Sequence, residues 1–493
     1  MLETEHYIDL AAGRFASTSA KDLESIFAKF VASPCATLVV HFHGGLNRTT
    51  EGIARVSQLA PIYLDAGAYP VFFVWESWVA EVAFNGVAEI FSETIFQGAV
   101  SRIRDFLLDK IRSSQVYRGV ADESAEDLAA RRALEAFVAD PAAAVSIPPA
   151  RRSQLFILTE RERRDFRDAV QNDALLRDEI GAIANAQRGG ADAERRERGG
   201  TAAHGLRQTR MNPEFLETVR DPGQAYRAAF ALKLASALLD ILVRVCKRLA
   251  NGHDHGLQAT IVEEVLRALY LVEGWFSWMK SQIEDAFKPD PAQYGGTAFL
   301  SGLQLLRQAG GRPRVVLVGH SAGSIYICNF LEHAKRMVPG QLFDVVFLTP
   351  AVSFERFAET LAGSADVIAN LKSIALTDAL EREDRWLPVL PDAYPASLLY
   401  FTSGVMEPDV SGNGDVAIVG MQRFFSDAGA PGSPACERVR AYFAAKPERL
   451  AWSVLDLRGA EGPREVEVGR HHGGFDEDAG TRAVLQSIIR DGF

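Results

Sequence analysis

Cysteine is scarce in this chain, and the scarcity limits the kinds of fold and site that the sequence can support. Only four cysteines occur among 493 residues, at positions 35, 246, 328 and 436. Their spacing is not that of a metal-ligand set, and so few cannot form the dense disulfide framework of a small secreted protein. We therefore expect a reduced, cytoplasmic protein.

Long apolar runs are also missing. No stretch reaches the ~18 consecutive apolar residues that are needed to span a bilayer. The nearest candidate, residues 225–249, is interrupted by Arg227, Lys233, Asp240 and Arg244. The first residues, Met1 to His6, lack the basic region and apolar stretch of a signal peptide. We expect neither a transmembrane segment nor an export signal.

An excess of positive charge is absent as well. The chain has 64 acidic and 53 basic residues, which gives a net charge of −11. This balance opposes a bulk role in binding nucleic acid or anionic lipid. Apolar residues make up 47% of a chain that is longer than one ordinary domain. The composition is therefore that of a globular protein with a large core.

The clearest chemical signal is a five-residue motif, G-H-S-A-G, at residues 319–323. It follows an apolar β-branched run at 315–318 and precedes an apolar helical stretch at 324–331. A strand, a tight turn and a helix are the context in which G-x-S-x-G forms a nucleophile elbow. We therefore predict that Ser321 is a nucleophile held in a strained turn between two sterically required glycines. A structural turn with an idle serine is the alternative.

A second glycine motif follows an earlier strand pattern. Residues 36–42 predict a buried strand, which runs into an H-G-G turn at residues 43–45. In serine hydrolases such a turn supplies part of the oxyanion hole, and the glycines let the backbone approach a substrate closely. The helix expected after Ser321 adds a second donor, the backbone amide of the residue that follows the serine. The expected oxyanion donors lie among Gly44, Gly45, Leu46 and Ala322.

Glycines also flank a histidine pair near the C-terminus, in the segment G-R-H-H-G-G-F-D at residues 469–476. A predicted helix at 478–490 follows it. A histidine in such a loop, after the serine in chain order, is suited to act as the general base. We assign this role to His472, which abuts the glycine pair, with His471 as the alternative. The other alternative is that both histidines are solvated loop residues with no catalytic role.

Three segments together resemble those of the α/β-hydrolase superfamily: the turn at 43–45, the elbow at 319–323 and the segment at 472–476. More narrowly, they resemble bacterial serine esterases or lipase-like members of unassigned substrate. The resemblance covers roughly residues 1–78 and 290–493. It implies an α/β fold, with a mostly parallel sheet flanked by helices, and a Ser-His-acid triad. It does not identify the acid.

The acid is expected at a strand end between the serine and the histidine. The strand predicted at 344–348 ends at Thr349, which is not an acid. The short strand predicted at 373–376 leads to Asp378, which is therefore the favoured acid; its alternative role is a helix cap. Another strand is expected at 397–401. The remaining candidate acids are Asp409, Asp415 and Glu355.

The middle of the chain nearly lacks strand patterns and shows helical periodicity instead. We therefore divide the chain into a first core part at 1–78, a helical cap insertion at 79–290 and a second core part at 291–493. A polar, glycine-bracketed stretch near 187–205 predicts a mobile loop inside the insertion. The insertion's large apolar residues form its own core or line an acyl pocket above Ser321.

Three minor patterns contain residue types that can bind a metal ion. His41 and His43 share a strand face but have no third ligand nearby in sequence, and residues 253–255 (H-D-H) predict a surface loop. Residues 409–415 carry alternating oxygen ligands like a calcium loop, yet the twelfth position of that loop is Gly420 instead of glutamate. We expect no metal and no other cofactor.

The sequence thus predicts a serine hydrolase that cleaves a small-molecule or lipid-like carboxylic ester, with an apolar acyl group. In this prediction Ser321 attacks the carbonyl, His472 is the base and Asp378 orients the imidazole. A thioesterase, a phospholipase or an acyltransferase would use the same site. The alternative of another class is a catalytically silent protein whose helical insertion binds a partner.

Overall fold

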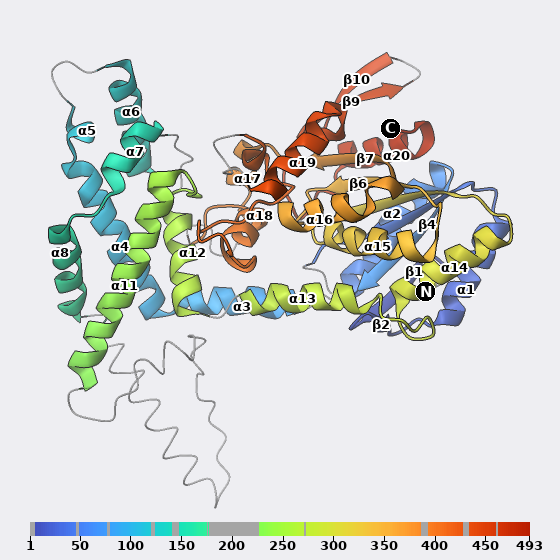
Figure 1. The fold of residues 1–493 in the computed structure, drawn as a ribbon, viewed down its shortest axis with the longest axis horizontal. Coiled ribbons are helices and arrows are strands. Elements are labelled where there is room, and N and C mark those ends of the chain that lie inside the picture. The colour runs from blue at the N-terminus through green and yellow to red at the C-terminus, as the bar shows by residue number, and fades with distance from the viewer. Residues whose placement is uncertain are drawn as a thin grey trace, which may run out of the picture.

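A mostly parallel, eight-stranded sheet flanked by helices forms the centre of the molecule (Figure 1). The computed structural model describes residues 5–45, 49–75, 79–119, 124–140, 147–174, 176, 226–270, 273–385, 393–426, 433–459 and 462–493. The strands are β1 (Tyr7–Ala11), β2 (Arg14–Phe15), β3 (Thr37–Phe42), β4 (Ala68–Trp75), β5 (Arg314–His320), β6 (Phe343–Leu348), β7 (Ile368–Ala375) and β8 (Leu450–Trp452). This is the α/β class that the sequence predicts.

The strand order is β2-β1-β4-β3-β5-β6-β7-β8. Only the edge pair β1–β2 is antiparallel within this sheet. A separate antiparallel hairpin is formed by β9 (Val454–Gly459) and β10 (Gly462–Glu467). The apolar runs of β3 and β5 are buried along nearly their whole length, as expected for central strands that are covered on both faces.

Helices cover both faces of the sheet because alternate strand residues point to opposite sides. One buried cluster joins one set of strand residues to α1 (Ala20–Ala32), α14 (Gly295–Gln308), α15 (Gly323–Met337), α16 (Phe354–Ser364) and α19 (Pro434–Ala444). The other cluster joins the opposite set to α2 (Thr49–Asp65) and α20 (Ala479–Asp491). The sheet is therefore the middle layer of three.

In helix α1 the local sequence determines where the helix begins and which face is buried. Ser19 caps its N-terminus in a capping box with Asp22, which satisfies two amides at the helix start. Leu23, Ile26 and Phe30 recur at helical spacing and are buried against the sheet. The cap and the apolar spacing together place α1 on the sheet.

Between residues 79 and 290 the described residues form helices and connections but no strand. In Figure 1 most of these helices lie to one side of the sheet, and α3 and α13 run side by side between the two regions. The loop expected near 187–205 lies outside the described residues. The helices are α3 (Val79–Ser92), α4 (Thr94–Ser113), α5 (Gln115–Arg118), α6 (Ala125–Ala139), α7 (Pro149–Phe156), α8 (Glu160–Gln171), α11 (Tyr226–Asn251), α12 (Leu257–Leu269) and α13 (Glu273–Asp285).

In the described part of the chain, no helix combines the length and the apolar character needed to cross a bilayer.

The strand expected at 397–401 is a helix instead. Helix α18 (Leu398–Phe401) begins where the Ser397 hydroxyl accepts a hydrogen bond from the Tyr400 amide at 3.3 Å. A short apolar run fits a buried helical turn as well as a strand, and here the serine cap decides between them. The edge of the sheet is taken by β8. The other short helices are α17 (Asp378–Glu383), η2 (Ala365–Val367), η3 (Thr402–Met406), η4 (Gln422–Phe425) and η5 (Pro447–Arg449).

Strands β3 and β5 are direct neighbours, with Phe42 opposite Gly319. Because they are parallel, the loops that follow them leave from the same edge of the sheet. The H-G-G turn and the G-H-S-A-G motif, which are far apart in sequence, therefore lie side by side.

Candidate active site

Ser321 lies in a strained turn between β5 and α15. Its φ angle is +51°, in the left-handed region that residues with a side chain rarely adopt. A methyl group placed on Gly323 would lie 2.2 Å from the carbonyl oxygen of Phe42, and one on Gly319 would lie 2.7 Å from the Gly323 oxygen. Both positions therefore require glycine, and the tight turn predicted from the sequence is confirmed.

Backbone hydrogen bonds hold this strained residue. The Ser321 amide donates to the carbonyl oxygen of Leu348 at 2.9 Å, and the Ser321 carbonyl accepts from the Ala351 amide at 3.0 Å. The Ser324 hydroxyl donates to the same carbonyl at 2.7 Å. Strained conformations persist only where the surrounding structure fixes them, and here the end of β6 does so.

The structure brings Ser321 and His472 together. The Nε2 atom of His472 lies 2.9 Å from the Ser321 Oγ atom. Both residues are buried, with exposed fractions of 6% for Ser321 and 3% for His472. His471, the alternative, instead has an exposed side chain that lies 3.4 Å from Asp384.

Burial keeps the imidazole of His472 neutral. It lowers the pKa of His472 to about 3, an effect that the neighbouring His320 increases and the negative charge of Asp476 opposes. A neutral imidazole is the form that can accept a proton from the serine hydroxyl. The site is therefore in the base form at neutral pH.

Asp378 does not contact His472. Its Oδ1 atom accepts a hydrogen bond from the Tyr400 hydroxyl at 2.5 Å, and its Oδ2 atom accepts one from Arg382 Nε at 2.9 Å. Burial alone would raise the pKa of Asp378, but Arg382 and Tyr400 lower it. The carboxylate thus has its own partners, and its assignment as the residue that orients His472 requires correction.

The other acids considered from the sequence have different partners too. Asp415 Oδ1 lies 2.8 Å from His253 Nδ1. Asp409 accepts from the Gly414 amide at 2.7 Å and the Ser411 hydroxyl at 2.8 Å, within a turn of its own loop. Glu355 lies in the first turn of α16.

Asp384 is the carboxylate in direct contact with His472. It follows α17, and its Oδ2 atom accepts a hydrogen bond from the His472 backbone amide at 2.7 Å. Burial raises the pKa of Asp384, and this hydrogen bond opposes the rise. The Nδ1 atom of His472 is buried and has no hydrogen-bond partner among the described residues. Asp384 follows the same strand as Asp378, six positions further on, so an acid expected after that strand does not by itself distinguish the two residues.

A second buried carboxylate, Asp476, lies next to the histidine loop. Arg55 donates a hydrogen bond to its Oδ1 atom, and its Oδ2 atom lies 3.8 Å from His320 Nδ1. Burial alone would raise the pKa of Asp476, but His320 and Arg55 lower it to about 2. Asp476 therefore stays ionised and supplies negative charge near His472.

The H-G-G turn packs against the elbow. A methyl group on Gly44 would lie 3.4 Å from Ser321 Cβ, and one on Gly45 would lie 3.1 Å from Ala322 Cβ. Ala322 is the N-cap residue of α15, where the helix dipole favours negative charge. Three of the four expected oxyanion donors are thus brought to Ser321, while Leu46 lies outside the described residues.

His43 fixes this turn as a neutral residue. Its Nδ1 atom lies 2.7 Å from the Gly44 carbonyl oxygen, and its Nε2 atom accepts from the Trp75 amide at 3.1 Å. Its ring stacks on Trp75 at 5.5 Å with an interplanar angle of 11°. Burial lowers the pKa of His43 to about 4. The histidine that follows β3 thus orders the glycine turn.

His41, which was weighed from the sequence as a metal ligand, has another partner. His41 Nδ1 lies 2.9 Å from the Tyr63 hydroxyl. Among the described residues there is no group of three or more histidine, cysteine or acidic residues that could hold a metal ion.

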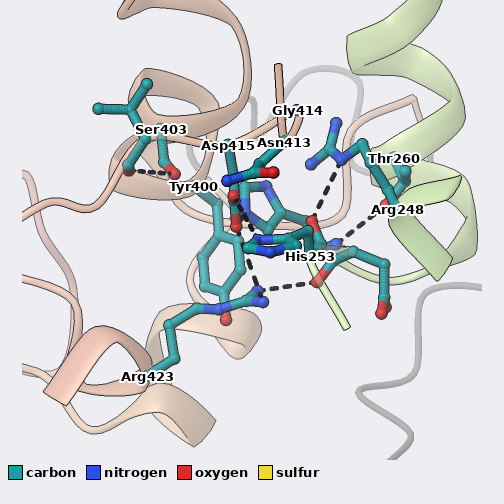
Figure 2. Close-up of polar contacts among 12 residues, drawn as sticks. Arg248, His253, Thr260, Tyr400, Ser403, Asn413, Gly414, Asp415 and Arg423 are labelled. Carbon is teal, nitrogen blue, oxygen red and sulfur yellow. Dashed lines mark hydrogen bonds and ion pairs between the residues drawn. The ribbon is translucent and has the colours of Figure 1, made fainter. Parts of the chain in front are cut away.

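The segment expected as a surface loop, residues 253–255, lies in a buried polar network that the sequence did not reveal. Figure 2 shows Arg248, His253, Asp415 and Arg423 within it. Burial alone would raise the pKa of Glu263, but His255 and Arg248 lower it to about 2. The network joins α11 and α12 to the segment that precedes η4.

Searches against protein-family models, curated proteins and solved structures gave no match.

Proposed function

We propose that this protein is a serine hydrolase of the α/β-hydrolase type that cleaves carboxylic esters through an acyl-enzyme intermediate. The observation that carries the proposal is the 2.9 Å contact between His472 Nε2 and Ser321 Oγ, made by a serine whose φ angle is +51°. A strained serine at a helix start beside a buried, neutral histidine is the arrangement that activates a hydroxyl nucleophile.

In the first half-reaction, Ser321 Oγ attacks the ester carbonyl carbon while His472 Nε2 takes the hydroxyl proton. His472 then gives that proton to the leaving alkoxide oxygen, and the alcohol departs. In the second half-reaction, water attacks the acyl carbonyl carbon while His472 Nε2 takes a proton from the water. His472 then gives this proton to Ser321 Oγ as the bond between Oγ and the acyl carbon breaks, and the carboxylic acid leaves.

The amides of Gly45 and Ala322 are the proposed donors to the oxyanion formed in each step. Gly45 packs on Ala322, and the N-terminus of α15 adds its positive dipole end. Removing one such donor in a serine hydrolase costs about 10²–10³ in kcat. This electrostatic stabilisation is expected to be a large part of the rate enhancement.

Asp384 is the proposed partner of the His472 imidazole. When Ser321 donates to Nε2, the His472 proton is on Nδ1, and a buried donor without an acceptor costs about 1–3 kcal/mol. The Asp384 carboxylate already accepts from the His472 backbone amide, which makes it the proposed acceptor for the Nδ1 proton as well. The ionised Asp476 stabilises the imidazolium at longer range.

The helical segment at 79–290 is proposed to act as a cap over this site. Its helix α13 contacts α15 and reaches the H-G-G turn. The reaction would therefore proceed beneath insertion residues and away from bulk water.

Steady-state and burst kinetics with p-nitrophenyl acetate test the proposal. The wild type should release a burst of one p-nitrophenol per active site, and Ser321→Ala should release none while keeping its circular dichroism spectrum. Equal rates in both proteins would contradict the assignment of Ser321. Acyl-thioesters and acceptor alcohols in the same assay distinguish a thioesterase or an acyltransferase, and complete inactivity favours the silent, partner-binding alternative.

A further inference from the structure

The sulfur of Met279 lies against the proposed oxyanion turn. A methyl group placed on Gly45 would lie 2.6 Å from Met279 Sδ and 3.1 Å from Ala322 Cβ. Gly45 is thus packed between the thioether and the residue after the nucleophile. Met279 is only 5% exposed, so helix α13 borders the turn on this side.

Close backbone contacts fix the C-terminal end of α13 on the core. A methyl group on Gly13 would lie 2.2 Å from the backbone nitrogen of Ala286, the residue after α13. One on Gly296 would lie 2.8 Å from the Ala286 oxygen, which also accepts from the Thr297 amide at 3.1 Å. Since neither glycine leaves room for a side chain, this end of α13 cannot shift without moving β1, β2 and α14 as well.

An ion pair fixes the same helix at its middle. Lys280 Nζ lies 2.8 Å from Glu407 Oε2. Glu407 is 5% exposed and directly follows η3. Because Lys280 adjoins Met279 in sequence, this contact holds the backbone that carries the thioether. These contacts therefore hold the Met279 side chain in place beside the H-G-G turn.

We propose that Met279 sets the size limit of the acyl group, so that this protein takes esters of short acyl chains, such as acetyl and butyryl, and excludes long ones. The inference rests on the proposed function, since it needs the substrate carbonyl oxygen between Gly45 and Ala322. Because Met279 Sδ packs on Gly45, the inference places the first carbons of the chain attached to that carbonyl against the thioether. One methylene too many in a filled pocket lowers the specificity constant about 10–200-fold.

The test compares kcat/KM for p-nitrophenyl acetate, butyrate and octanoate. The wild type should favour acetate over octanoate by about 100-fold or more, and Met279→Ala should reduce this ratio at least about 10-fold by raising the octanoate value. Met279→Phe should lower the butyrate value more than the acetate value. Met279→Leu, which conserves volume, should keep the wild-type profile. Met337→Ala, at the far end of α15, is the matched control and should also keep it.

Two results would overturn the inference: an octanoate preference in the wild type, or unchanged chain-length ratios in both Met279→Ala and Met279→Phe. Each variant is first labelled with a fluorophosphonate to show that its serine is reactive. A labelled protein with unchanged ratios overturns the role of Met279 and leaves the proposed function intact. Absence of labelling and of hydrolysis in the wild type overturns both.

Discussion

His472 Nε2 lies 2.9 Å from Ser321 Oγ although the two residues are 151 positions apart in sequence. Each residue is held through its backbone. The Ser321 amide donates to the Leu348 carbonyl oxygen, and the His472 amide donates to the Asp384 carboxylate. The His472 carbonyl oxygen also lies 2.9 Å from His320 Nε2. The contact is therefore set by the ends of β5 and β6 and by the C-terminal loop. Such preorganisation is what nucleophilic catalysis requires.

The pH dependence of kcat/KM should reflect the lowered pKa of His472. The base is active when neutral, and burial lowers its pKa to about 3, so protonation should inactivate it only well below the ordinary value of 6.5. We expect a nearly constant kcat/KM between pH 7 and 5 in a hydrolysis assay, with circular dichroism to exclude acid unfolding. A half-loss of activity near pH 6.5 would show an imidazole with an ordinary pKa.

Asp384→Asn should lower kcat strongly because an amide in this place favours the wrong histidine tautomer. The analogous change in a serine protease costs about 10⁴-fold. Asp378→Asn is the matched control, since Asp378 pairs with Arg382 and Tyr400, and it should stay within a few-fold of the wild type. The measurement is kcat with p-nitrophenyl acetate.

Combining Asp384→Asn with His472→Ala should add little to either change alone, because residues that act as a unit are not additive. A normal rate for Asp384→Asn together with a large loss for Asp476→Asn would move the acid assignment to Asp476.

Gly323→Ala should destabilise the fold by about 1–3 kcal/mol or more, because overpacking against backbone cannot be relieved by a rotamer change. The added methyl group would lie 2.2 Å from the Phe42 carbonyl oxygen. Gly363→Ala in α16, where no atom lies within 4 Å of the new methyl group, is the control. It should gain up to about 1 kcal/mol from helix propensity. Urea unfolding measures both, and equal midpoints would contradict the packing argument.

Arg248→Met should cost about 3–5 kcal/mol, because it leaves buried carboxylates without their cation. Arg248 is 1% exposed, and its guanidinium lies 2.7 Å from Glu263 and 3.1 Å from Glu264. Arg244→Met is the comparison: Arg244 also pairs with Glu264, but its side chain is 46% exposed, so its loss should cost less than about 1 kcal/mol. A smaller loss for Arg248→Met in urea unfolding would argue against a buried ionic network.

The positions of Ser321 and His472 were predictable because each residue lies in a short glycine-containing motif. Gly319 and Gly323 are required by atoms of the turn and of a neighbouring strand. The H-G-G turn was predictable for the same reason, and the pairing of β3 with β5 brings it to Ser321. The catalytic roles themselves stay predictions.

The carboxylate that hydrogen-bonds to His472 was not predictable, because its identity depends on which way a single short helix faces. Asp378 and Asp384 lie at the two ends of α17, and only the folded helix shows that the first faces Arg382 while the second faces His472. The strand expected at 397–401 was wrong because a four-residue apolar run has no period that separates strand from helix. The network around Arg248 joins segments about 160 residues apart, which no local pattern can reveal.

The most direct test of Ser321 as the nucleophile is to locate the site of fluorophosphonate labelling by peptide mass spectrometry. We expect one phosphonylated residue, Ser321, with no label in Ser321→Ala and strongly slowed labelling in His472→Ala. Labelling of another serine, or undiminished labelling of the Ser321→Ala protein, would contradict it.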